Sequence, residues 1–274
     1  MNIGIEGHLY TRYDISGQKD LSIERWFSQE IEGPFVEALD RLTSGMGISI
    51  SPLPAIDREK ERNLRDLGFV VPNKVERLLL SREHRRAIDC YLAALLVRNP
   101  VYLAKIAQFH DRNEAPLPVE VPRNDAIKTI ALDNMLSVFR IYQDRIAQSH
   151  LGLLYATGDN ELLFSDAGIT AEEPWRPGTL PFDIHAPLTP TMALEVLPTP
   201  NQTPGECFIM RMNNQGIARM NRLALADAQR FVFSRQRPPI EFIKSHFGKP
   251  APKSIGIRPI GAGVVTKFDR SRDH

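Results

Sequence analysis

The sequence predicts an α+β fold, with a mainly helical body and a small antiparallel sheet or hairpins in the second half of the chain. Apolar residues recur at helical spacing over most of residues 23–149, whereas short apolar runs bounded by turn residues dominate from residue 151 onward. A run of helices followed by a run of strands is typical of α+β proteins. The order of elements therefore argues against a parallel nucleotide-binding sheet.

Helices are predicted over residues 23–42, 57–67, 74–97 and 125–149, with apolar positions at i, i+3 and i+4. Asn99-Pro100 bends or ends the third, and a further helix is expected to continue towards His110. Gly33-Pro34 interrupts the first helix. Because a proline removes a hydrogen bond and clashes one turn back, we expect a kink or two short helices there. The two prolines within residues 49–55 indicate a loop.

The second half of the chain predicts mostly strands. The elements expected are strands at residues 151–155, 162–164, 193–197 and 207–212, a helix over 214–233, and a weak hairpin of 255–260 with 264–268. Gly158-Asp159-Asn160 separates the first two strands, and a turn of this composition between apolar runs indicates a β-hairpin.

Charge and composition divide the chain into two parts. Residues 1–234 are interpreted as a single mainly helical α+β domain, and residues 235–274 as a basic, Pro/Gly-rich C-terminal tail. The net charge of the chain is +1, but the tail alone holds nine Lys/Arg and three Asp/Glu. Such a tail could contact phosphate groups or an acidic surface. The alternative is a solvated and partly disordered terminus.

The overall composition, 42% hydrophobic and 24% charged residues, is that of a globular protein. The chain lacks an apolar run of about 18 residues, and its first residues lack the basic start and apolar core of a secretory signal. We therefore expect a cytoplasmic protein with no membrane partner. Cys90 and Cys207 lie far apart among apolar neighbours, which predicts buried free thiols. The sequence indicates no metal site and no particular cofactor.

Seven short motifs follow one another in an order typical of a known family. They are Tyr10-Thr11, Ile23-Glu24 with Ile31-Glu32, Arg98-Asn99-Pro100, Ser165-Asp166, Pro187-Leu188-Thr189-Pro190, Asn221 and Phe231-Val232-Phe233-Ser234. On these motifs the chain resembles, over about residues 10–234, the bacterial and fungal family catalogued as domain of unknown function 4238. That family has no assigned activity, so the resemblance implies no reaction. Two family features differ: Ala167-Gly168 replaces an Asn-Pro pair, and a His-x-x-Pro-Gln opening has no counterpart before Tyr10.

Ser165 and Asp166 are the first candidates for chemistry, because a strand end would present a hydroxyl and a carboxylate side by side. A nucleophilic serine needs a base within hydrogen-bond reach, and His150 and His185 are the histidines near it in sequence. The alternative is that Asp166 accepts main-chain N–H groups of the following loop, as aspartate commonly does in turns.

Arg98 and Asn221 complete the candidate set. By its place in the family order, Arg98 could pair with Asp166 or with a ligand anion through its planar guanidinium; the alternative is that it binds the last carbonyls of its helix. Asn221 could hydrogen-bond the hairpin. Residues 81–86 are rich in arginine and could bind phosphate, but helical spacing distributes them around the helix, which favours a solvated helix start.

Two functions are compatible with these residues. The favoured one is a non-catalytic binding or assembly module that recognises a protein partner or nucleic acid through the basic tail. The alternative is a hydrolase or nuclease of toxin or defence type centred on Ser165 and Asp166, in which a cation could be held by Asp159, Glu161, Asp166 and Asp183. The lack of a Gly-rich phosphate loop, a His-Glu-x-x-His motif and a Gly-x-Ser-x-Gly motif favours the first function.

Overall fold

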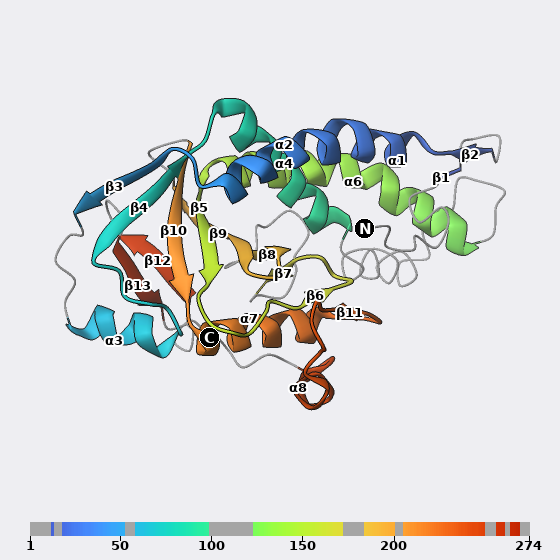
Figure 1. The fold of residues 1–274 in the computed structure, drawn as a ribbon. Coiled ribbons are helices and arrows are strands. Elements are labelled where there is room, and N and C mark those ends of the chain that lie inside the picture. Colours follow the sequence, from blue (N-terminus) through green and yellow to red (C-terminus); the bar gives the residue numbers. More distant parts are fainter. Residues whose placement is uncertain are drawn as a thin grey trace.

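A mixed seven-stranded sheet forms the centre of the protein in the computed structural model (Figure 1). The structure describes residues 12–13, 18–52, 58–98, 123–171, 184–200, 205–249, 256–260 and 264–268. Across the sheet the strands are β3 (Ile48–Pro52), β4 (Lys74–Leu79), β10 (Glu206–Met212), β5 (Ser149–Ala156), β9 (Met192–Pro200), β8 (Ile184–Thr189) and β7 (Thr170–Ala171). β10 and β5 run parallel, and the other neighbours run antiparallel.

This sheet corrects the predicted fold class. We expected a mainly helical body with a small antiparallel sheet in the second half, but the sheet is large and mixed, and it takes β3 and β4 from the first half of the chain. The arrangement is of the α/β type. The predicted loop at residues 49–55 is wrong for residues 49–52, which belong to β3, and residues 53–55 lie outside the described residues, as does the further helix expected towards His110. The predicted helix over 74–97 is wrong at its start because residues 74–79 form β4.

The predicted hairpin of residues 151–155 with 162–164 is also wrong. Residues 149–156 form the central strand β5, whose two neighbours are β10 and β9. Residues 162 and 163 lie outside the strands, and β6 (Phe164–Ser165) pairs instead with β11 (Val232–Phe233). The predicted strands at 193–197 and 207–212 are confirmed as parts of β9 and β10, and the C-terminal hairpin is confirmed as β12 (Gly256–Ile260) and β13 (Val264–Phe268).

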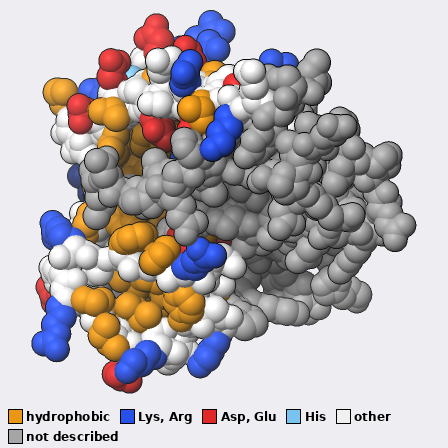
Figure 2. All heavy atoms as spheres, turned by 90° about the vertical axis from the view of Figure 1, so that its right-hand side faces the viewer, with side chains coloured by type: hydrophobic (Ala, Val, Ile, Leu, Met, Phe, Trp, Pro, Cys, Tyr) orange, Lys and Arg blue, Asp and Glu red, His pale blue; other side chains and the backbone are white. Residues whose placement is uncertain are grey.

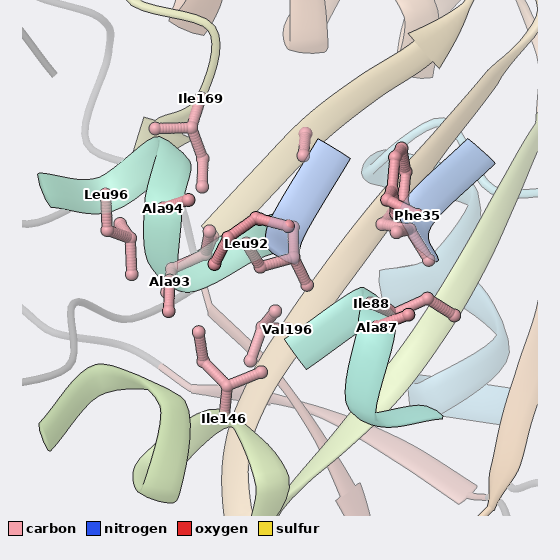
Figure 3. Close-up of a cluster of buried hydrophobic side chains, with 14 of the residues drawn as sticks. Phe35, Ala87, Ile88, Leu92, Ala93, Ala94, Leu96, Ile146, Ile169 and Val196 are labelled. Carbon is pink, nitrogen blue, oxygen red and sulfur yellow. The ribbon is translucent and has the colours of Figure 1, made fainter. Parts of the chain in front are cut away.

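Most of the helices encoded before residue 148 cover one face of the sheet (Figure 1). They are α1 (Ser22–Trp26), the π-helical segment η1 (Phe27–Glu32), α2 (Gly33–Ser44), α4 (Arg82–Arg98) and α6 (Arg123–Ala147). Their apolar side chains and those of the sheet form the larger core, as Figure 3 shows around Leu92, Leu96 and Val196. β1 (Arg12–Tyr13) and β2 (Lys19–Asp20) form a separate antiparallel pair.

Pro34 explains the π-helical segment. The predicted interruption at Gly33-Pro34 takes the form of a widened turn, in which the Gly33 N–H reaches back to the Ser28 carbonyl. A π turn of this kind inserts one residue and lets the helix continue past a site where the regular hydrogen-bond ladder is broken. The helical path therefore continues from residue 22 to residue 44.

The opposite face of the sheet carries a second, smaller core. Leu154, Ala193 and Met212 of the sheet pack there with Ile217 and Met220 of α7 (Asn214–Asp227). Leu64 and Leu67, in and just after α3 (Arg58–Asp66), join the same cluster. Because side chains alternate along a strand, Leu153 faces the first core and Leu154 the second. Beyond α7 lie β11 and the short helix α8 (Ile240–His246).

Both cysteines are free thiols, as predicted. Cys207 is fully buried, and burial raises the pKa of its thiol to about 12. Cys90 is partly buried and accepts a hydrogen bond from Gln143 at 3.1 Å. Within the described ranges, none of the helices combines the length and the apolar character needed to cross a bilayer.

Candidate functional site

Ser165 and Asp166 meet a distant segment that follows α7. β6 pairs antiparallel with β11, so Ser165 lies opposite Val232 and Phe164 lies opposite Phe233. Ser165 is buried, with 8% of its surface exposed. Two motifs that are far apart in the sequence, Ser165-Asp166 and residues 231–234, are therefore neighbours in the fold.

Both carboxylate oxygens of Asp166 accept main-chain hydrogen bonds from this segment. The Gln229 N–H donates to Oδ1 at 2.9 Å and the Arg230 N–H donates to Oδ2 at 2.8 Å. The Asp166 N–H in turn donates to the Phe231 carbonyl at 3.1 Å. The structure thus shows the alternative role considered for Asp166, although the N–H donors come from a loop more than 60 residues away rather than from the next loop.

Asn221 and Glu161 make further hydrogen bonds between the segment that contains β6 and the part of the chain from α7 onward. Asn221 on α7 accepts a hydrogen bond from the Leu163 N–H at 2.8 Å and donates one to the Glu161 carbonyl at 2.8 Å. Asn221 therefore binds the chain before β6, although the hairpin that it was predicted to bind does not form. The Glu161 carboxylate accepts from the Arg235 guanidinium and, at 3.2 Å, from the Gln236 N–H. We call the contacts of residues 161–166 with Asn221 and residues 229–236 the clasp.

The clasp supports an exposed surface made by residues 229–249, which we call the β11–α8 surface. None of these residues is buried, and Phe231 and Ile240 expose 58% and 47% of their surface. Figure 2 shows the side of the molecule that is on the right in Figure 1. Hydrophobic side chains gather in the lower part of that view, at the height of β11 and α8, with Lys and Arg side chains among and around them. The basic residues of the segment are Arg230, Arg235, Arg237, Lys244 and Lys249. An exposed apolar patch with a charged rim is typical of an interaction site.

Arg98 lies in the last turn of α4 and pairs with Glu32. Its Nη1 donates to Glu32 Oε1 at 2.6 Å, and its guanidinium carbon lies 4.9 Å from the centre of the Phe27 ring. The motifs that contain Glu32 and Arg98 are thus brought together. Arg98 and Asp166, which the sequence analysis paired, each have other partners in the structure.

His185 and His150 lie on strands β8 and β5, which β9 separates. His185 on β8 is opposite Glu195 on β9, with Nδ1 3.8 Å from Oε1, and each residue is 1% exposed. Burial, and to a smaller extent the charge of Arg219, lowers the pKa of His185 to about 3. His185 is therefore neutral at neutral pH and a poor general base. The His150 ring on β5 packs 5.6 Å from the Phe208 ring.

Gly152 provides the space that Glu195 occupies. A Cβ at this position of β5 would lie 3.4 Å from Glu195 Oε2 and 2.9 Å from the end of the Met210 side chain. Glu195 is not among the residues predicted from the sequence, whereas Glu161 is predicted as a cation ligand and Glu32 as part of a motif. In the structure each of the three has a cationic or imidazole partner. The available signal for Glu195 was a carboxylate in the middle of an otherwise apolar strand.

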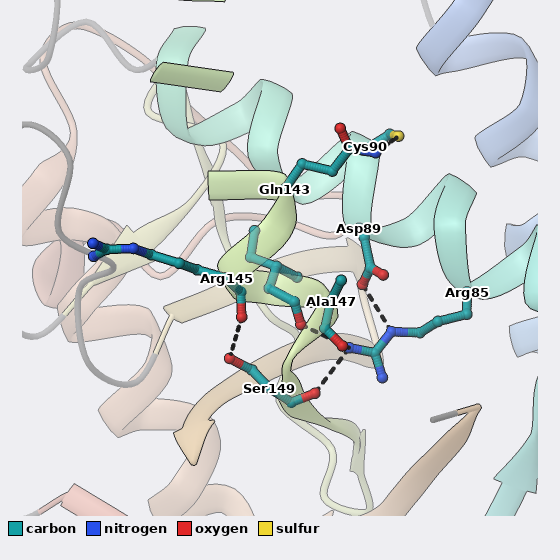
Figure 4. A network of polar contacts seen from close by, with 8 residues as sticks. Arg85, Asp89, Cys90, Gln143, Arg145, Ala147 and Ser149 are labelled. Carbon is teal, nitrogen blue, oxygen red and sulfur yellow. Dashed lines mark hydrogen bonds and ion pairs between the residues drawn. The ribbon is translucent and has the colours of Figure 1, made fainter. Parts of the chain in front are cut away.

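The arginine-rich start of α4 has a structural role at one residue (Figure 4). Arg85 is buried, and its guanidinium donates to the carbonyls of Ile146 and Ser149 at 2.7 and 2.8 Å and to Asp89 at 2.8 Å. It thereby binds the C-terminal end of α6. Burial raises the pKa of Asp89 to about 6, against the opposing effect of Arg85. Arg82 and Arg86 are exposed, so the predicted phosphate cluster is divided between core and surface.

Among the described residues no three His, Cys, Asp or Glu side chains are grouped closely enough to hold a metal ion. Asp183 and Tyr10-Thr11 lie outside the described residues. A family model described as Protein of unknown function (DUF4238) matches residues 1–238. Neither the curated proteins nor the solved structures contain a match to this chain.

Proposed function

The chain belongs to this family of proteins of unknown function, and we propose that it is a cytosolic, non-catalytic binding module whose partner binds the β11–α8 surface. The observation that carries the proposal is that none of residues 229–249 is buried and that apolar and basic side chains are interspersed among them. The segment holds five Lys/Arg and one Glu, so the partner carries negative charge beside apolar or aromatic groups.

The contacts of Asp166 favour this function over a hydrolase centred on Ser165. A catalytic carboxylate needs an oxygen directed at a substrate, a base or a cation, and each oxygen of Asp166 already accepts a main-chain N–H. These hydrogen bonds hold residues 229 and 230 in place, directly before the exposed Phe231 ring. The family motif thus positions the proposed interface.

The test is capture of a partner from an extract of the producing cells by the full-length chain, with and without treatment of the extract by nucleases. We expect Phe231→Asp and Ile240→Asp each to abolish capture, because they place charge in the apolar part of the surface. Val36→Asp is the matched control, since Val36 is equally exposed, at 57%, but lies on α2. Loss of the signal after nuclease treatment, with a steep fall in added salt, would identify nucleic acid as the partner.

Two results would contradict the proposal. The first is a captured partner that binds both β11–α8 variants as well as it binds the Val36→Asp control. The second is esterase or phosphodiesterase activity of the purified protein that Asp166→Ala abolishes while the urea midpoint of unfolding stays unchanged. The second result would instead support the hydrolase alternative.

A further inference from the structure

A separate surface, the free edge of strand β3, also has the features of an interaction site. β3 is the end strand of the seven-stranded sheet, and β4 is its one neighbour among the described strands (Figure 1). An end strand presents a row of main-chain N–H and C=O groups to which a further strand can be added. This edge is distant in sequence from residues 229–249, and its test is independent of the proposed function.

The register of β3 and β4 shows which main-chain groups point outward. The Leu79 N–H donates to the Gly47 carbonyl at 3.3 Å, and Ser49 and Ser51 lie opposite Arg77 and Val75. In an antiparallel pair, hydrogen-bonded and non-hydrogen-bonded positions alternate. Residues 47, 49 and 51 therefore bond to β4, and Ile48 and Ile50 direct their N–H and C=O groups away from the sheet.

The side chains at this edge are apolar and exposed. Ile48 and Ile50 expose 39% and 57% of their surface, and Met46, just before the strand, exposes 63%. Protein sheets usually protect an exposed edge with lysine or another charged residue, or with a bulge. Residues 48–52 read Ile-Ser-Ile-Ser-Pro and carry no charge. Within the strand, Pro52 at its end is therefore the one residue that opposes the addition of another strand.

We propose that the β3 edge binds the β3 edge of a second copy of this chain, in an antiparallel two-fold arrangement centred on Ser49. In that register Ile48 of one copy lies opposite Ile50 of the other. The outward N–H and C=O groups of both isoleucines then form four main-chain hydrogen bonds across the two-fold axis. The isoleucines of the two copies share one face as cross-strand pairs, and the two Ser49 residues face each other on the opposite face.

Self-complementarity is the reason for choosing a second copy over an unrelated strand. A two-fold interface requires each residue to fit its own symmetry mate. In this register each isoleucine lies opposite an isoleucine of the second copy, Ser49 lies opposite Ser49, and no two like charges lie opposite each other. Pro52 lacks an N–H, so it ends the run of outward donors and limits the pairing to this short strand. The short interface predicts a dimer that forms at high protein concentration rather than an obligate one.

Sedimentation velocity of the full chain over a concentration series tests the association. We expect reversible dimerisation, and we expect Ile50→Lys and Ile50→Pro each to raise the dimer dissociation constant about tenfold or more. The proline removes one outward N–H and leaves the bonds of β3 to β4 in place; the lysine tests the same edge if the proline variant does not fold. Val36→Lys is the matched control, because Val36 on α2 is as exposed as Ile50, at 57%, and this variant should dimerise like the wild type.

Cysteine cross-linking tests the register. In the proposed pairing the two Ser49 Cα atoms form a non-hydrogen-bonded pair about 4.5 Å apart, within reach of a disulfide. Ser49→Cys should therefore form a covalent dimer under mild oxidation. Ser51→Cys should not, because Ser51 lies opposite Gly47 of the second copy. A wild-type chain that stays monomeric throughout the series, a dimer that persists in both Ile50 variants, or equal cross-linking at positions 49 and 51 would overturn the proposal.

Discussion

Replacement of Asp166 by alanine tests whether the clasp stabilises the fold. The substitution removes two hydrogen bonds, of 2.9 and 2.8 Å, from main-chain N–H groups to a carboxylate. A hydrogen bond to a charged group contributes about 1.5–3 kcal/mol to stability. Because Asp166 is partly exposed, each of its two bonds should contribute at or below the lower limit of this range. We therefore expect a loss of about 2 kcal/mol in the free energy of unfolding, and about half of that for Asp166→Asn, which keeps one acceptor oxygen.

Urea unfolding measures this loss directly. With an m-value of about 3 kcal/mol/M, Asp166→Ala should lower the midpoint by about 0.7 M urea without a change in slope. Asp159→Ala is the matched control because Asp159 is an exposed aspartate in the turn before the clasp. Equal midpoints for the Asp166→Ala and Asp159→Ala variants would refute the stabilising role of the clasp.

Three further outcomes follow from buried groups. His185 has a folded pKa of about 3 against 6.5 in the unfolded chain, so the unfolded state binds an extra proton between these values and stability falls as the pH is lowered. Between pH 7 and pH 5 the free energy of unfolding, measured with urea, should fall by about 2 kcal/mol more in the wild type than in His185→Gln. Gly68→Ala should cost about 3 kcal/mol or more and lower the calorimetric melting temperature, because Gly68 has φ +82° and a Cβ would lie 2.1 Å from the Gly216 nitrogen. Arg85→Met should cost about 3–5 kcal/mol because it leaves Asp89 buried without its partner, whereas the double variant with Asp89→Leu should recover much of that stability in the same assay.

The helices with strong apolar periodicity were predictable from the sequence, and the strands that mimic helical spacing were not. Val75, Leu78 and Leu79 are spaced as on a helix, yet they belong to β4. The charged residues between them, Glu76 and Arg77, are satisfied by Arg211 and Ser51 on the neighbouring strands, and one sequence does not reveal these partners. The missed local signal was Ser81, whose hydroxyl accepts the His84 N–H and starts α4 there.

The candidate site was predictable as a set of residues but not as an arrangement. The motifs identified Ser165, Asp166, Asn221 and residues 231–234, which the fold brings together. Their mutual contacts depend on the return of the chain after α7, a long-range feature that local spacing does not encode. The order of the motifs therefore indicated a shared structural unit. The hydroxyl of Ser165 and the carboxylate of Asp166 at its centre suggested a catalytic site.

Strand β10 has a consequence for how the chain is made. It lies between β4 and β5 and is the last strand of the large sheet to be synthesised. Until residue 212 leaves the ribosome, the strands encoded before residue 80 and those encoded after residue 148 have no shared neighbour through which to join. In a nascent chain that has not reached that point, the edges of β4 and β5 that β10 later covers have no partner strand from the large sheet.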